Sequence, residues 1–199
     1  MHSDLNELVK MDERVARQTA EVVDQVRAGD LTRSTPCADW DLGELLAHMT
    51  AQHHGFAAAA AGRGEDPVAW QHPQLGDDPA ATYRASVDAV VAAFAVDGLD
   101  EQLFAVPDFG PDVRLPAVQA VSAHLVDYIV HGWDVARSLD VPFEPDADAV
   151  RAALDVAEQI PDGPERREPG SPFAPAVPVS DGAAPLRRLL ALLGRDPDA

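Results

Sequence analysis

The sequence predicts an all-α protein, an antiparallel four-helix bundle with short extra helices and a proline-rich C-terminal segment. Apolar residues recur at helical spacing in four long segments, and no segment of comparable length alternates apolar and polar residues as a strand does. Proline and glycine gather between these segments, where the chain must turn. The 199 residues are 46% hydrophobic, which is enough apolar material for the core of one domain.

The first two helices are expected near the N-terminus. Residues 4–27 show the helical apolar period, and Gly29 follows as a stop signal. A second helix is expected over residues 42–61, because Asp41 and Glu44 have the three-residue spacing of a capping box. The segment between these two helices contains proline and several residues that favour turns, so it is predicted as a loop.

The third and fourth helices are separated by a segment that favours turns. A helix over residues 80–96 is expected after Asp78 and Pro79, which suit the N-cap and the first turn. Residues 103–115 combine proline and glycine with short apolar stretches, which favours a loop or a small hairpin. A long helix is then expected over residues 116–139, and it carries most of the side chains with chemical potential.

The C-terminal part is expected to be less regular than the bundle. A fifth helix is predicted over residues 146–159, and residues 161–185 contain seven prolines, which requires an extended or irregular backbone. A short amphipathic helix follows over residues 186–193. We therefore expect a single domain with its bundle core in residues 1–160, a proline-rich segment in residues 161–185 and a C-terminal helix in residues 186–194.

The composition of the chain argues against several classes of binding partner. The chain has 34 acidic and 15 basic side chains, and a formal net charge of −19 argues against nucleic-acid binding. No apolar run is long enough to span a bilayer, and the N-terminus lacks the pattern of a signal peptide. The single Cys37 excludes an internal disulfide and a cysteine-rich zinc site. We expect a cytoplasmic monomer or homodimer that binds a small-molecule substrate, with no nucleic acid and no membrane partner.

Four short polar side chains share one strip of the long helix over residues 117–139. They are His124, Asp127, His131 and Asp134, at spacings of three, four and three. Asp127 and His131 are neighbours on a helix surface and can bind one metal ion. The alternative is an ordinary solvent face, although such faces in acidic proteins usually carry longer charged side chains.

A third ligand is expected from a facing helix. His48 lies on the shoulder of the apolar stripe of the second helix, where a lone histidine is otherwise a core or boundary residue. Together with Asp127 and His131 it would give three nitrogen and oxygen ligands and leave positions open for water or substrate. Such a set suits zinc, with nickel, iron or manganese as alternatives. Asp134 is then either a hydrogen-bond acceptor for His131 or the partner of a salt bridge to Arg137.

The amino-acid sequences of three segments resemble those of a known family. They are residues 36–49 (PCADWDLGELLAHM), 124–139 (HLVDYIVHGWDVARSL) and 173–197 (FAPAVPVSDGAAPLRRLLALLGRDP). The sequence is similar to actinobacterial metal-binding proteins related to the N-terminal domain of mycothiol-dependent maleylpyruvate isomerase, within the DinB-like group of four-helix bundles. The resemblance covers nearly the whole chain and implies the DinB-like bundle.

The resemblance also implies a site and a chemistry. A histidine of the second helix and an acid-x-x-x-His pair bind the metal in that group, which implies His48, Asp127 and His131 here. Asp127 stands where the isomerase has the longer glutamate, so His124 is the alternative third ligand. Relatives use the metal to activate a low-molecular-weight thiol, which implies a transferase or isomerase with mycothiol as co-substrate. His124 and Asp134 would then be candidate proton carriers.

Two other functions remain open at this point. The chain can be a non-catalytic metal-binding or small-molecule-binding sensor of the same fold, or a metal-free structural bundle. Cys37 has no histidine or basic residue beside it in the sequence, so a catalytic thiol is not expected. His72 lies in a predicted connector with no sign of a role.

Overall fold

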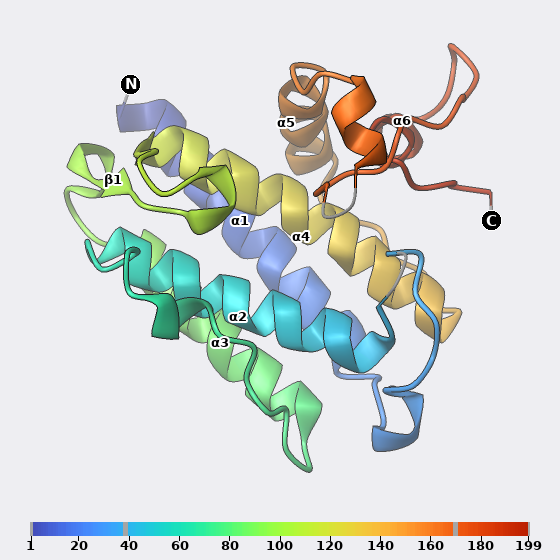
Figure 1. Ribbon diagram of the computed structural model, residues 1–199, viewed down its shortest axis with the longest axis horizontal. Helices are drawn as coiled ribbons and strands as arrows, with labels where there is room; N and C mark the ends of the chain where they lie inside the picture. Colours follow the sequence, from blue (N-terminus) through green and yellow to red (C-terminus); the bar gives the residue numbers. More distant parts are fainter. Residues whose placement is uncertain (1, 38–39, 169–170, 199) are drawn as a thin grey trace.

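The protein is all-α, as the sequence predicts. The computed structural model describes residues 2–37, 40–168 and 171–198, and in these residues four long helices form the body of the molecule (Figure 1). Strand structure in the described residues is limited to one antiparallel pair, in which Leu103 lies opposite Pro116. The helices are α1 (His2–Val23), α2 (Leu42–Ala60), α3 (Pro79–Phe94), α4 (Ala117–Leu139), α5 (Ala147–Ala157) and α6 (Pro185–Leu192), and the strands are β1 (Leu103–Phe104) and β2 (Leu115–Pro116).

Capping residues determine where α2 and α3 begin. The Asp41 carboxylate accepts a 2.9 Å hydrogen bond from the Glu44 amide, and the Glu44 carboxylate accepts a 3.0 Å bond from the Asp41 amide. This reciprocal pair satisfies two amides that would otherwise lack partners at the start of α2. At α3 the Asp78 carboxylate accepts from the Ala81 amide at 2.9 Å, and Pro79 is the first helical residue. Both helix starts confirm the sequence prediction.

The core forms between helix faces that are buried along their length. Helix α1 packs along α4 and α2 packs along α3, while α2 also contacts α4. Leu42, Leu45 and Met49 of α2 are fully buried with Leu125 and Ile129 of α4. Each such side chain stabilises the fold by about 2 kcal/mol when it leaves water.

Helices α2 and α4 run in opposite directions, so the first turns of α2 lie beside the last turns of α4 (Figure 1). The hydroxyl of Tyr128 donates to the carbonyl of Met49, which links the two helices through their buried faces. The loop before α2 is attached to the helix start, since the Leu42 amide donates to the Arg33 carbonyl at 2.9 Å. The antiparallel arrangement therefore brings polar residues early in α2 close to polar residues late in α4.

The proline-rich segment is irregular, as predicted, apart from one 3-10 turn over Pro164–Arg167 in its described part. Pro169 lies outside the described residues. Arg166 is buried, and its guanidinium donates hydrogen bonds to four backbone carbonyls. The acceptors are the carbonyls of Pro161 (2.8 Å), Leu192 (2.6 Å), Ala174 (3.3 Å) and Ile160 (3.3 Å).

The end of α1 differs from the sequence prediction. The helix stops at Val23 and does not continue to residue 27. Its last amides shift to three-residue hydrogen bonds, Gln25 to the Val22 carbonyl and Val26 to the Val23 carbonyl. Val26 is nevertheless buried, so the apolar period extends beyond the helix and makes it look longer in the sequence.

No helix within the described part of the chain is both long enough and apolar enough to cross a membrane.

Replacing Arg166 with alanine should lower the free energy of unfolding by about 3 kcal/mol, because a buried side chain and its hydrogen bonds to four carbonyls would be lost. Arg167→Ala is the matched control, since the neighbouring Arg167 is exposed. Urea unfolding followed by circular dichroism measures the free energy of unfolding of both variants. Equal stability of the two variants would show that Arg166 does not organise the proline-rich segment.

Candidate metal centre

Three metal-binding side chains converge between the second turn of α2 and the middle turns of α4. Ligand atoms of His48, Asp127 and His131 all lie within 4.8 Å of one another. The Nε2 atom of His131 is 3.3 Å from Oδ1 of Asp127, and the ring centroids of His48 and His131 are 5.4 Å apart. The structure thus brings together the three residues that the sequence singled out as one set.

Helix geometry explains this convergence. Asp127 and His131 are one turn apart on α4, so their side chains extend from the same face. His48 lies in the second turn of α2, which is beside the last turns of α4 in the antiparallel arrangement. His131 is nearly buried at 8% side-chain exposure, Asp127 is 30% exposed and His48 is half-buried. The group is therefore closed toward the core and open to solvent on one side.

The second nitrogen of His131 is fixed by a buried carboxylate. Nδ1 of His131 lies 3.0 Å from Oδ2 of Asp134, which has no exposed side-chain surface. Because a carboxylate only accepts hydrogen bonds, Nδ1 is the donor, and Nε2 faces Asp127. A carboxylate on the far nitrogen of a metal-ligating histidine is a recurrent arrangement that sets the orientation of the ring.

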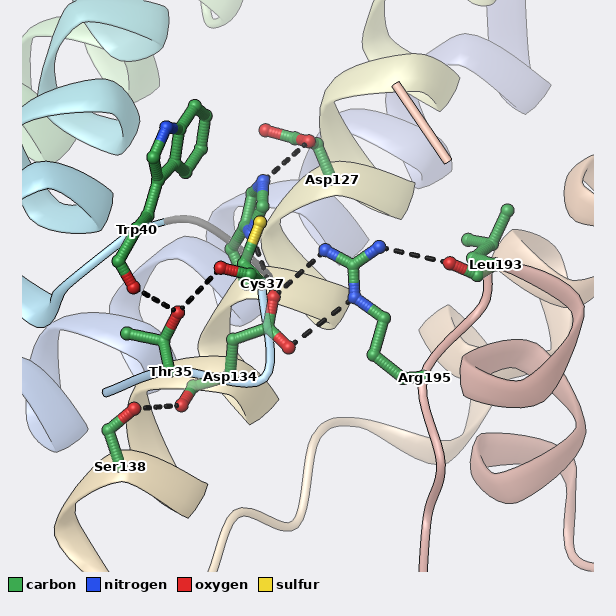
Figure 2. Close-up of polar contacts among 9 residues, drawn as sticks. Thr35, Cys37, Trp40, Asp127, Asp134, Ser138, Leu193 and Arg195 are labelled. Carbon is green, nitrogen blue, oxygen red and sulfur yellow. Dashed lines mark hydrogen bonds and ion pairs between the residues drawn. The ribbon is translucent and has the colours of Figure 1, made fainter. Parts of the chain in front are cut away.

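Arg195 completes this chain of contacts from the C-terminal end of the protein. Its guanidinium lies between Asp134 and the carbonyl of Leu193 (Figure 2), with Nη2 3.0 Å from Asp134 Oδ2 and Nη1 3.0 Å from the Leu193 oxygen. Arg195 is 7% exposed and Asp134 is fully buried, so the two charges neutralise each other out of solvent. The segment after α6 is thereby connected to the candidate centre.

The side chains of the candidate centre change one another's pKa values. Burial alone would lower the pKa of His131, but the charge and hydrogen bond of Asp127 and the bond to Asp134 raise it to about 9. For Asp127 burial acts to raise the pKa, and the charge and hydrogen bond of His131 lower it to about 2. Burial lowers the pKa of His48 to about 4, so this imidazole is neutral at neutral pH. Asp127 and His48 are thus in the forms that bind a metal, and an ion would displace the proton of His131.

A second group of ligand atoms shares His131. Cys37, His131 and Asp134 also have ligand atoms within 4.8 Å of one another. Both oxygens of Asp134 are already engaged, one 3.4 Å from Arg195 Nε and the other 3.0 Å from Arg195 Nη2 and His131 Nδ1. The guanidinium supplies the positive charge here, so this second group fits a metal ion less well than the first. Cys37 has no histidine or basic residue beside it in the sequence, but folding brings His131 of α4 and Arg195 of the C-terminal segment near it.

His124, the alternative third ligand, does not belong to either group. Its ring is fully buried, with Nδ1 2.7 Å from Oδ1 of Asp12 on α1. It is stacked on Tyr128 at a centroid distance of 4.2 Å. His124 lies about one turn before Asp127 on α4, but its polar contact is directed toward α1. The strip of polar residues on α4 is therefore mostly buried, and the solvent-face interpretation is wrong.

Aromatic rings surround the open side of His48. Trp40, in the loop before α2, lies 4.6 Å from His48 between ring centroids and 6.4 Å from His131. His72, from the connector before α3, lies 5.7 Å from His48. The ring of Trp40 packs against the core and so attaches this loop to the bundle. It also shields one side of the candidate centre.

The donor set of the first group fits a borderline divalent ion. Two imidazole nitrogens and one carboxylate oxygen form a three-ligand set of the kind found in catalytic zinc sites. Two donors on a tetrahedral zinc ion lie about 3.3 Å apart when each bond is about 2.0 Å. The separation of His131 Nε2 from Asp127 Oδ1, 3.3 Å, already has that value.

Two residues near the centre could not be found by spacing arguments. Arg195 is 61 positions from Asp134, and its contact depends on the path of the proline-rich segment. His72 belongs to a connector without helical periodicity. Neither carries a local pattern that distinguishes it from a surface residue.

Comparison with known proteins gives one family and two relatives. A family model described as the mycothiol maleylpyruvate isomerase N-terminal domain matches residues 13–136. Two proteins of Mycobacterium tuberculosis, from strains CDC 1551 / Oshkosh and ATCC 25618 / H37Rv, are described as uncharacterized. Each is 27% identical over 190 residues, which are 93% of this chain and 98% of the relative. No solved structure gives a significant match.

The ion pair of His131 should make the stability of the metal-free protein depend on pH. A pKa raised in the folded state stabilises the fold below the unfolded value near 6.5, and this contribution is lost as pH rises through about 9. We expect His131→Gln to lower the free energy of unfolding by about 2 kcal/mol at pH 6 and by much less at pH 9.5. Urea unfolding in the presence of a chelator measures this difference. A loss of unfolding free energy that is constant or larger at high pH would contradict the raised pKa of His131. The control is His54→Gln, which should not show this pH dependence.

Proposed function

Because the chain belongs to the family of the mycothiol maleylpyruvate isomerase N-terminal domain, we propose that it binds one divalent metal ion through His48, Asp127 and His131. The observation that carries the proposal is the convergence of these three ligand atoms within 4.8 Å. The matched residues 13–136 include all three positions. Zinc is the first candidate for two imidazoles and a carboxylate, and nickel, iron and manganese accept the same donors.

The proposed activity is that of an enzyme which activates a low-molecular-weight thiol, or water, against a small-molecule electrophile. Mycothiol is the thiol named in the description of the family, and a transferase or isomerase reaction is the class we assign. A bound ion would lower the pKa of a coordinated thiol or water and so supply a nucleophile near neutral pH. Three protein ligands leave a position for that molecule on the solvent side.

The side chains around the centre have distinct proposed roles. His48 is neutral because of burial, so it binds without losing a proton. Asp134 is a positioning residue that directs Nε2 of His131 toward the ion, and the guanidinium of Arg195 holds its carboxylate in place. The role of proton carrier suits Asp134 poorly, since both its oxygens are engaged. His124 is also a poor proton carrier, because it is fully buried against Asp12.

The open side of the centre determines what can approach. Asp127 is 30% exposed and His48 is half-buried, so a ligand reaches the ion between them. The indole of Trp40 forms a wall at 4.6 Å from His48 and reduces access of water from the loop side. This geometry suits a small molecule with a thiol head. The net charge of −19 remains unfavourable for a nucleic-acid partner.

Purified protein should contain about one divalent ion per chain, and both His48→Ala and His131→Ala should lose it. Three ligands are the minimum for such a site, so removing one leaves two weak contacts. Elemental analysis after gel filtration measures the ratio of metal ions to protein chains. His54→Ala, an exposed histidine of α2, should keep the ion. An unchanged metal content in both site variants would reject the ligand assignment.

Thiol activation should be visible directly in a cobalt-substituted sample. Titration with mycothiol should produce a sulfur-to-metal charge-transfer band, and the apparent affinity should rise with pH as the thiolate forms. A simple thiol such as 2-mercaptoethanol tests whether residues beyond the ion recognise the sugar part. If neither thiol gives the band while cobalt is bound, the enzyme activates water or the protein is a metal-binding sensor, and the thiol proposal fails.

A further inference from the structure

His72 is exposed to solvent and yet lies against the candidate centre. It belongs to the connector that leads from the 3-10 turn at Pro67–Trp70 to the start of α3. Its ring meets that of His48 edge-on at a centroid distance of 5.7 Å. This is the open side of the centre, where the three proposed ligands leave a coordination position.

The connector is anchored on both sides of His72. Before it, the ring of Trp70 packs against α2 at Gly55, where a Cβ atom would lie 2.2 Å from the indole. After it, the carbonyl of Leu75 accepts a 2.9 Å hydrogen bond from Thr82 of α3. Few residues separate these anchors, so the position of His72 beside α2 is set by packing at both ends.

The distances from the His48 ring to two other imidazole rings are those expected for rings that share an ion with it. Two imidazoles on one tetrahedral zinc ion, with bonds of about 2.0 Å, have ring centroids about 5 Å apart. His48 is 5.4 Å from His131 and 5.7 Å from His72, so its two histidine neighbours are at similar distances. Ligand atoms of His48, Asp127 and His131 are the nearer set, and the exposed side chain of His72 must move to join them.

The rings of His48 and His72 are close enough for positive charges on both of them to repel each other. Two imidazoles that repel each other when protonated gain from sharing a cation when neutral, because each then directs a lone pair at the same positive charge.

We propose that His72 is a fourth protein ligand, which occupies the open coordination position of the proposed metal site and is displaced when a thiol binds. The proposal rests on the metal site of the proposed function. It makes the resting site a closed His₃Asp set and the thiol-bound site one in which the thiol takes the place of His72, with the exposed side chain of His72 as the part that moves.

Cobalt-loaded full-length protein tests this directly, since the visible absorption of cobalt(II) depends on coordination number. Wild-type protein should show the strong absorption of a four-coordinate ion. In His72→Ala, two waters should enter where the imidazole leaves and make the ion five-coordinate, so the absorption should fall several-fold, and cobalt affinity should fall about 10- to 100-fold. His72→Gln is a second variant that keeps the size and polarity of the side chain, and it should behave like His72→Ala.

Affinity for 2-mercaptoethanol gives a second readout, which should rise in the variant in which cobalt affinity falls. If a thiol must displace His72, removal of the imidazole should increase thiol affinity in the cobalt-loaded variant. His54→Ala should match the wild type in every measurement. A His72→Ala spectrum and cobalt affinity equal to those of the wild type would overturn the proposal. Unchanged cobalt affinity with weaker thiol binding would also overturn it, because His72 would then recognise the thiol and not the ion.

Failure of the fourth ligand can be separated from failure of the site. If His48→Ala abolishes cobalt binding and His72→Ala changes nothing, the three-ligand site stands and only the role of His72 is rejected. If His48→Ala retains cobalt with wild-type affinity, the proposed site itself is rejected, and His72 with it.

Discussion

The imidazole of His131 is bound at both nitrogens, and the candidate centre depends on this double contact. Nε2 lies 3.3 Å from Asp127 and Nδ1 lies 3.0 Å from Asp134. Two carboxylates on one ring fix its orientation and raise its pKa, so the metal-free protein carries a proton where an ion would bind. Asp134 in turn requires Arg195 as well as His131, because a carboxylate with no exposed surface needs charged donors at both of its oxygens.

This requirement connects the C-terminal segment to the centre. Two buried guanidiniums organise that segment in different ways, Arg166 through backbone carbonyls and Arg195 through the carboxylate of Asp134. Arg166 therefore connects the proline-rich segment to the end of α6 through donors that a helix or sheet would otherwise provide, and Arg195 makes the contact with the bundle. Its irregular path places Arg195 beside α4, so a segment with little secondary structure contributes to the electrostatics of the candidate centre.

Local signals predicted the helices and the core of the site. Capping residues such as Asp41 and Asp78 mark helix starts through contacts a few residues away, and the four-residue spacing of Asp127 and His131 follows from the helix itself. His48 required only the assumption that a facing helix supplies the third ligand. Arg195 and His72 could not be predicted, since their positions depend on the path of irregular segments. The end of α1 was misplaced because Val26 remains buried after the helix stops.

The most direct test of the central claim is X-ray absorption spectroscopy at the zinc edge of zinc-loaded protein. His131 is shared by two groups of ligand atoms, and only one of them contains a sulfur atom. If His48, Asp127 and His131 bind the ion, the first shell will contain nitrogen and oxygen at about 2.0–2.1 Å, with the outer scattering of imidazole rings. A sulfur contribution at about 2.3 Å in the absence of added thiol would place the ion at Cys37 and Asp134 and contradict the account.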